Sequence, residues 1–173
     1  MQTFYVDQTG ACLGSFDGPP GESPWSGGAI TTPPEDATLQ RWDGLTWVWP
    51  TEALREKLLA TISEQYLLAL QRGLPYGGKV LQIREQDQPN LTTMGSEARW
   101  AKAVNAAWAS DFAWRMADNS FLILPNVDAM IALADAAKAE VYRLQRVKWA
   151  HVDAVRALVQ SSDIAAYNFA AGW

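Results

Sequence analysis

Residues 113–125 read AWRMADNSFLILP, and this stretch decides the fold. Apolar side chains alternate with other residues on both sides of a polar Asp-Asn-Ser turn at 118–120. The alternating side chains are Trp114, Met116, Phe121 and Ile123. A period of two predicts a half-buried β-hairpin. Pro125 then stops the strand, and Asn126 and Asp128 suit the cap and first turn of a helix. The sequence therefore predicts a hairpin that leads directly into a helix.

A helical pattern precedes this hairpin. Thr51 is expected to cap a helix in which apolar side chains recur every four residues as far as Leu70. Gly73 then occupies the place of the left-handed residue that ends many helices. A turn at 74–78 is expected before a short strand at 79–84.

Two further helices are predicted. The first extends from about residue 92 to residue 110, and its apolar side consists of Met94, Ala98, Ala101, Val104 and Trp108. The second begins near Asn126 and has no glycine or proline before Gly172, so it could run past residue 158. At 1.5 Å per residue, such a helix is on the order of 50 Å long. We expect part of it to project or to meet a partner.

The first fifty residues have a different character. They contain six of the nine prolines and seven of the twelve glycines. Residues 4–16 predict a small hairpin that turns at Gly10, and residues 41–49 predict a second one that turns at Asp43-Gly44. The stretch between them, 18–35, is too rich in proline and glycine for regular structure. We interpret it as an extended arm that becomes ordered only against a neighbour.

These patterns predict an α+β protein with three parts. Residues 1–50 form a β and extended arm. Residues 51–160 form a mostly helical domain of two helices, a small β-hairpin and one long helix. Residues 161–173 form an apolar tail with a fresh helix cap and few charges, which we expect to dock on a surface.

The net charge of −5 lies in one part of the chain. Residues 1–50 hold six acids and one arginine, whereas residues 51–173 hold thirteen groups of each sign. Because binding to a phosphate backbone needs basic surface, this distribution argues against nucleic-acid binding. The sequence contains no run of eighteen apolar residues, so we expect no membrane insertion. Residues 1–7 lack the basic start and apolar core of a secretory signal, so we expect synthesis in the cytoplasm.

The sequence offers little material for catalysis. Cys12 is the single cysteine and is expected to be a small, half-buried strand residue, while His151 is the single histidine, on the long helix. No pair of histidines, Cys-x-x-Cys or calcium-loop spacing occurs. Four carboxylates lie near the hairpin in sequence, namely Glu97, Asp111, Asp118 and Asp128. Asp118 suits the turn and Asp128 the helix start, so we predict no catalytic, cofactor-binding or metal-binding residue.

Nine tryptophans are more than a core of this size needs. Those in expected helices or in the hairpin are predicted to belong to the core: Trp100, Trp108, Trp114 and Trp149. Aromatic residues on arms, turns and the tail are the candidates for binding a partner: Trp25, Trp42, Trp47, Trp49, Tyr167, Phe169 and Trp173. Tryptophan and tyrosine are enriched at the centres of protein interfaces. For the five tryptophans among these candidates, local packing remains an equal alternative.

Residues 54–158 resemble an uncharacterised domain family of tailed bacteriophages, found in small proteins encoded beside tail-fibre genes. The shared features are WRxADN at 114–119, a following proline, MIALA at 130–134, and a basic, aromatic end of the last helix with Tyr142, Arg143, Arg146 and Lys148. Residues 1–50 are similar to the leaders of phage tail proteins. The resemblance implies a role in the virion tail and brings no catalytic residue with it.

Three functions follow as alternatives. The first is a non-enzymatic structural adaptor that binds tail-fibre or tail-tip proteins. Such an adaptor would be assembled in the host cytoplasm and would then remain in the tail of the virion. The second is a tail-fibre assembly chaperone, and the third is a carbohydrate-binding adhesin in which Trp42, Trp47 and Trp49 stack on sugar rings. Phage-tail symmetry suggests a homo- or hetero-oligomer, with a trimer as one candidate form. No cofactor is expected.

Overall fold

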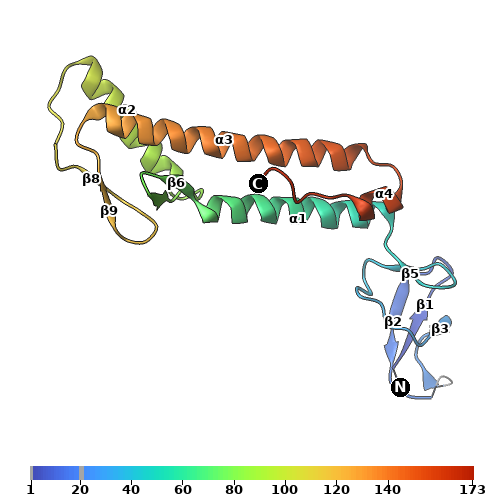
Figure 1. Ribbon diagram of the computed structural model, residues 1–173. Coiled ribbons are helices and arrows are strands. Elements are labelled where there is room, and N and C mark those ends of the chain that lie inside the picture. The colour runs from blue at the N-terminus through green and yellow to red at the C-terminus, as the bar shows by residue number, and fades with distance from the viewer. Residues whose placement is uncertain (1, 20–21) are drawn as a thin grey trace. The chain divides into compact units, whose positions relative to one another are not determined.

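The computed structural model of the protein describes residues 2–19 and 22–173 and combines helices with short antiparallel hairpins (Figure 1). The elements in chain order are β1 (Thr3–Val6), β2 (Cys12–Phe16), β3 (Gly28–Ile30), β4 (Arg41–Trp42), β5 (Trp47–Val48), α1 (Thr51–Arg72), β6 (Leu74–Tyr76), β7 (Lys79–Leu81), α2 (Gln88–Ala103), β8 (Ala113–Arg115), β9 (Phe121–Ile123), α3 (Val127–Ala157) and α4 (Ser161–Ala166). The predicted α+β class is confirmed.

The chain divides into two units. The first, called the N-terminal unit, extends to Leu59 and includes Val155–Tyr167. The second, called the helical unit, consists of Ala60–Ala154 and Asn168–Trp173. Each unit is described by itself.

A three-stranded antiparallel sheet organises the N-terminal unit, in the order β2-β1-β3. Strand β3 belongs to the stretch predicted as an irregular arm, and that prediction was wrong for residues 28–30. The strand forms because the free edge of β1 carries backbone N–H and C=O groups that need partners. Glycine permits the close approach: a Cβ at Gly27 would lie 2.2 Å from the carbonyl oxygen of Val6. The neighbour that orders this part of the arm is thus the chain's own β1.

The N-terminal unit has a small core of its own. Val6, Ile30 and Trp47 are buried, and Phe4, Cys12 and Trp42 pack against them. Cys12 is half-buried in β2, as predicted. The buried side-chain oxygen of Gln40 accepts hydrogen bonds from the backbone N–H groups of Glu35 and Asp36, at 2.7 and 3.2 Å. These hydrogen bonds attach residues 35–40, at and just after the end of the predicted arm, to the N-terminal unit.

The core of the helical unit lies where α1, α2, α3 and the two hairpins meet. Its buried side chains are Tyr66, Ala69, Leu70, Leu81, Ile83, Leu91, Ala98, Met116, Leu124, Met130, Leu133, Ala134, Ala137 and Leu144. Helix α2 crosses the first half of α3 in the antiparallel direction (Figure 1). The two helices touch at Gly95, where a Cβ would lie only 2.7 Å from the Cβ of Ala134. A glycine is needed here because the two helices approach so closely.

Helix α2 differs from the predicted helix at 92–110 at both ends. It begins earlier because Pro89 fits the first turn of a helix, where its missing N–H costs nothing. It ends earlier because Asn105 adopts a left-handed φ of 52°. The N–H groups of Asn105 and Ala106 then donate to carbonyls of the last helical turn, at 3.4 and 2.8 Å. Trp108 therefore lies outside the helix.

The segment after α1 is a hairpin and not a turn followed by one longer strand. Gly73 has a φ of 75° and ends α1, as predicted. Residues 74–76, expected in a turn, pair with β7 instead. The actual turn is Gly77-Gly78, where both residues have positive φ, as the type I′ hairpin turn requires. The predicted strand at 79–84 ends at Leu81.

The hairpin at 113–125 forms as predicted, but one strand presents the opposite face. Trp114 pairs with Leu122 across the strands, and Asn119 has a φ of 64° in a three-residue loop. This odd loop length puts Leu122 inward and leaves Phe121 and Ile123 exposed by 60% and 53%. The expectation that Phe121 and Ile123 share the inner face was wrong, because an odd-length turn pairs even-numbered positions with each other and so places Leu122 on the face of Trp114 and Met116.

Helix α3 begins as predicted and ends slightly earlier than expected. The side-chain oxygen of Asn126 accepts a hydrogen bond of 2.9 Å from the N–H of Ala129, which is a helix N-cap. The helix ends at Ala157 and does not run past residue 158. Its 31 residues give a length of about 46 Å. In the described part of the chain, no helix combines the length and the hydrophobicity needed to cross a bilayer.

Candidate partner-binding surface

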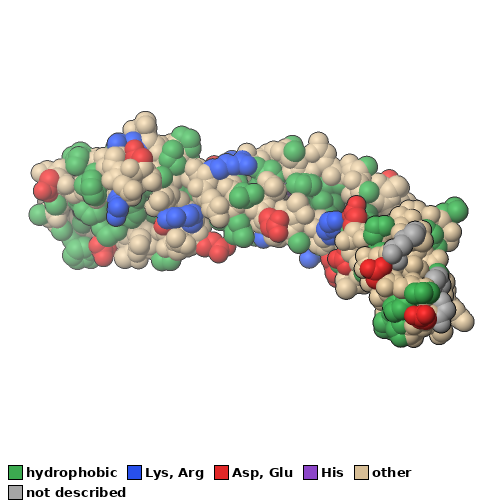
Figure 2. Space-filling view, turned by 90° about the horizontal axis from the view of Figure 1, so that it is seen from below, with side chains coloured by type: hydrophobic (Ala, Val, Ile, Leu, Met, Phe, Trp, Pro, Cys, Tyr) green, Lys and Arg blue, Asp and Glu red, His purple; other side chains and the backbone are tan. Residues whose placement is uncertain are grey.

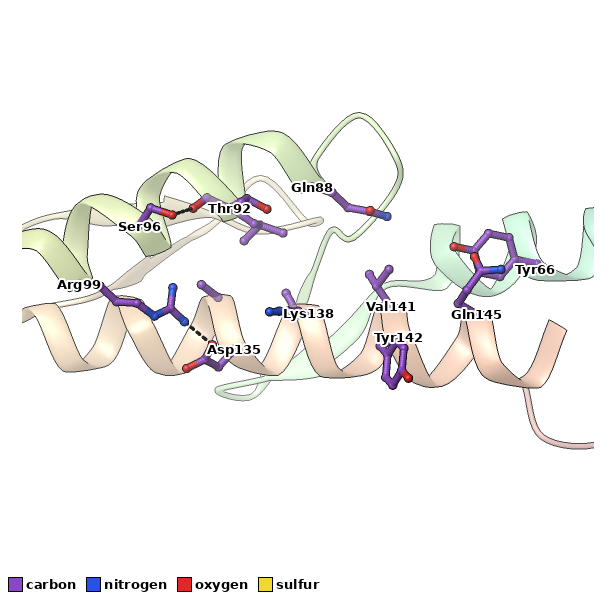
Figure 3. A pocket seen from close by; sticks show the side chains of 13 residues that line it. Tyr66, Gln88, Thr92, Ser96, Arg99, Asp135, Lys138, Val141, Tyr142 and Gln145 are labelled. Atoms are coloured by element: carbon purple, nitrogen blue, oxygen red, sulfur yellow. Dashed lines mark hydrogen bonds and ion pairs between the residues drawn. The ribbon is translucent and has the colours of Figure 1, made fainter. Parts of the chain in front are cut away.

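A groove of 630 Å³ lies between α2 and α3 in the helical unit (Figure 3). It opens where the helices diverge from their contact at Gly95. The side chains that line it are Tyr66, Gln88, Leu91, Thr92, Ser96, Arg99, Ala134, Asp135, Ala137, Lys138, Val141, Tyr142 and Gln145. Its size is within the range of ordinary binding sites for small ligands or side chains.

The groove has an apolar floor and a polar rim. The floor consists of Leu91, Ala134, Ala137 and Val141, three of which are small or β-branched. At one end, Arg99 on α2 forms an ion pair with Asp135 on α3 (Figure 3). Lys138 follows one turn later, and no carboxylate of the described residues forms an ion pair with it. The rim therefore carries one cation that a ligand could neutralise.

Tyr66 closes the other end of the groove. Its ring is buried, and the ammonium of Lys148 lies 5.0 Å from the ring centroid. Burial, helped by the negative charge of Glu85, raises the pKa of the Tyr66 hydroxyl. The phenol therefore stays protonated and can donate a hydrogen bond at neutral pH.

Two large aromatic side chains on α3 are exposed. Tyr142 lines the groove, and Trp149 lies further along the same helix. Tyr142 is 59% exposed and Trp149 is 51% exposed. They lie seven residues apart, so they share one face of the helix. Residues 138–148 also carry four basic groups and one acidic group. This face is thus aromatic and basic, in a protein whose net charge is negative.

The prediction that every tryptophan on a helix belongs to the core was wrong for Trp100 and Trp149. Trp100 on α2 is 64% exposed, and Trp149 is also mostly in solvent. For Trp149 a signal was present in the sequence, since this residue lies off the apolar stripe that runs through Met130, Ala137 and Leu144. Trp108 and Trp114 do pack against the core.

The candidate tryptophans of the N-terminal unit are largely used in packing. Trp47 is buried, donates its indole N–H to the carbonyl of Thr32 at 2.7 Å, and contacts Trp42 edge-on at 5.6 Å between ring centroids. Trp25 covers Gly14, where a Cβ would lie 2.6 Å from the indole ring. The structure therefore brings Trp42 and Trp47 together as a structural pair.

Trp49 has a different neighbour. The ammonium of Lys57 lies 4.2 Å from the centroid of its ring, a cation–π contact at the start of α1. The indole is half-buried. Trp49 therefore offers only part of its surface to a partner.

Trp173, the last of the C-terminal candidates, lies against the chain's own α3. Trp173 stacks on the imidazole of His151 at 5.5 Å between ring centroids and packs against the core. Its indole N–H donates to the carbonyl of Phe169 at 2.7 Å. Arg143 donates to the carbonyl of Gly172 at 2.5 Å. The apolar tail thus docks within the chain, and Tyr167 and Phe169 are half-buried.

Sequence reasoning missed the tip of the β4–β5 hairpin. Leu45 is 89% exposed there, the largest exposed fraction among the large hydrophobic side chains of the described residues. Asp43 accepts hydrogen bonds of 2.8 Å from the N–H groups of Leu45 and Thr46. These bonds, the one from Thr46 first, hold the pKa of Asp43 below its ordinary value. The Asp-Gly turn was visible in the sequence, but the exposure of the next leucine was not.

Exposed apolar side chains also occur at the hairpins of the helical unit. They include Val80, Phe121 and Ile123. In Figure 2, hydrophobic side chains are frequent over the end that carries β6, β8 and β9 in Figure 1. The backbone N–H of Ala117 donates to the carbonyl of Val80 at 2.9 Å, so the two hairpins support one another.

The carboxylates considered for catalysis have structural contacts or lie in solvent. Asp118 accepts bonds from the hydroxyl and N–H of Ser120, at 2.6 and 2.9 Å, and these two contacts chiefly lower its pKa. Asp128 forms an ion pair of 2.6 Å with Lys102. Glu97 and Asp111 are exposed. Over residues 2–19 and 22–173, no three side chains of histidine, cysteine, aspartate or glutamate are grouped so that they could hold a metal ion.

Comparison with known proteins identifies a family but no function. Residues 53–171, more than half of the chain, match DUF4376, a domain of unknown function, and the protein therefore belongs to that family. The match includes the run 54–158 discussed above. Neither a curated protein nor a solved structure matches the chain.

Proposed function

We propose that this DUF4376 family member is a structural, non-enzymatic component of a bacteriophage tail, an adaptor that binds tail-fibre or tail-tip proteins. The phage context rests on the sequence resemblance of residues 54–158 and of the first fifty residues. The binding role rests on the surface of the helical unit. The protein would be assembled in the host cytoplasm and retained in the virion.

The observation that carries the proposal is the aromatic face of α3 beside an apolar-floored groove. Tyr142 and Trp149 are both more than half exposed, although burial of such rings is strongly favourable. Exposed aromatic residues that adjoin a concave apolar surface are typical of protein interfaces. A tail protein that covers them would gain both the aromatic contacts and the groove.

The set of residues proposed to bind a partner therefore differs from the set predicted from the sequence. Sequence reasoning placed the partner-binding residues on the arm and the tail. We now place Tyr142 and Trp149 first, because Trp42, Trp47 and Trp173 already pack within the chain. Two of the three tryptophans proposed for sugar stacking are in that group, so we do not carry the adhesin function forward.

The test is co-purification of the protein with tail proteins from phage-infected cells. Tyr142→Ala combined with Trp149→Ala should weaken capture of tail-fibre or tail-tip proteins by roughly thirtyfold or more, as for other interface hot spots. Leu67→Ala combined with Leu68→Ala is the matched control, since these α1 side chains are 43% and 45% exposed and lie outside the groove.

Both double variants should keep the helical content of the wild type, because none of the four substituted side chains is buried. Equal capture by the wild type and by the Tyr142 and Trp149 double variant would contradict the assignment of the surface. Capture of no tail protein by the wild type would contradict the proposed function itself.

A further inference from the structure

The tip of the β4–β5 hairpin presents an apolar side chain in an ordered conformation. Leu45 is 89% exposed, whereas exposed leucines elsewhere in the N-terminal unit, such as Leu39 at 41%, keep more of their surface covered. Asp43 binds both of the N–H groups that follow Gly44, and Gly44 has a φ of 104°. The turn is therefore fixed by its own hydrogen bonds, and little entropy would be lost if Leu45 were buried by a partner.

The groove of the helical unit has the complementary properties. Its floor is apolar and contains Ala134 and Ala137, whose short side chains leave room for a leucine. Lys138 stands at the rim. A ligand with a leucine next to a carboxylate would bury the leucine on the floor and place its charge beside Lys138.

The distribution of charge also favours contact between copies of this chain. All of the net charge of −5 is carried by residues 1–50, which include Asp43, whereas residues 138–148 of α3 carry four basic groups against one acidic group. The N-terminal unit of one molecule and the groove face of another therefore attract one another.

We propose that the hairpin tip of one copy, residues 43–46, docks in the α2–α3 groove of a second copy, with Leu45 on the apolar floor and Asp43 beside Lys138. The contact joins two different surfaces, so it is heterologous and leads to a ring or to an open chain of copies. It uses the groove that the proposed tail role also uses, but the two can fail separately, since self-association can be measured without any tail protein.

The first experiment measures the association of the full-length protein by sedimentation velocity over a range of concentrations. Leu45→Ala should weaken association by about tenfold to a hundredfold, the effect of removing a buried leucine side chain. Leu39→Ala is the control and should associate as the wild type does. A wild type that stays monomeric up to its solubility limit would overturn the proposal, as would equal association of Leu45→Ala and the wild type.

The charged contact has its own test. Asp43→Asn keeps an oxygen for the turn but removes the charge, and Lys138→Gln removes the opposite charge. Each should weaken association several-fold at low salt, and the double variant should be no weaker than either single variant, because the two groups act as a pair. Losses that simply multiply in the double variant would show that Asp43 and Lys138 do not meet.

Mixing variants distinguishes a heterologous contact from a symmetric one. Leu45→Asp destroys the tip but leaves the groove, and Lys138→Glu damages the groove but leaves the tip. Each alone should remain monomeric, whereas their mixture should form a one-to-one dimer through the remaining intact tip and groove. A mixture that stays monomeric while the wild type associates would overturn the assignment of these two surfaces.

Discussion

Replacement of Gly73 by alanine tests the joint between α1 and the β6–β7 hairpin. Gly73 has a φ of 75°, in the left-handed region, where alanine costs about 1–2 kcal/mol. A Cβ here would also lie 2.5 Å from the carbonyl oxygen of Leu81 and 2.6 Å from a methyl carbon of Val80. Strand β7 would have to shift, and such overpacking costs about 1–3 kcal/mol. We expect a total loss of about 2–5 kcal/mol.

Gly78 provides a matched control. It also has a φ of 75°, but nothing lies within 4 Å of a Cβ at that position. Gly78→Ala should therefore lose only the backbone contribution of about 1–2 kcal/mol. Urea unfolding followed by helical circular dichroism gives both free energies of unfolding. Equal losses for the two variants would refute close packing between the end of α1 and β7.

Three further changes test other parts of the helical unit. Asn119→Val should cost about 1–2 kcal/mol because of the left-handed φ, whereas Asn119→Gly should be nearly neutral; thermal denaturation compares them. The pKa of Asp118 is lowered, so its contribution to stability is complete above its ordinary pKa of 3.8 and is lost as the pH falls through the lowered value. Urea unfolding at several pH values should therefore show the wild type and Asp118→Asn converging in acid; a constant difference would contradict this. Trp173→Ala should lose about 1–3 kcal/mol, as for a half-buried aromatic residue, and an unchanged urea midpoint would show that the tail does not dock on α3.

The sequence was sufficient for the elements whose signals are local. Gly73 and Asn126 marked helix ends correctly, because a left-handed glycine and a capping side chain act within a few residues. The hairpin at 113–125 was predicted for the same reason. Its inner face was half wrong, because the alternation was read separately in each strand, whereas the odd-length turn pairs Leu122, and not Phe121 or Ile123, with Trp114.

Contacts between distant residues were beyond this kind of prediction. Strand β3 forms because β1, more than twenty residues earlier, offers a free edge to residues 28–30. Helix α2 ends at an asparagine that sequence reasoning did not treat as a stop signal. The α2–α3 groove depends on Gly95 meeting Ala134, a pair that no periodicity connects.

For the candidate surface, the sequence predicted the types of residue on α3 but not which of them are exposed. The basic, aromatic end of α3 was recognised in sequence, but which of its aromatic rings face solvent depends on how α1, α2 and the tail cover the helix. The same limitation led us to seek the binding residues among Trp42, Trp47 and Trp173. These side chains are apolar and lie outside the main helices, yet the chain packs all three.

The most direct test of the proposed tail role is quantitative mass spectrometry of purified particles of the phage that encodes this chain. A structural adaptor should be present in a fixed ratio to the tail-fibre or tail-tip proteins, and in the same ratio after repeated purification. Its absence from mature particles that contain those proteins would contradict the structural role and leave the assembly chaperone as the alternative.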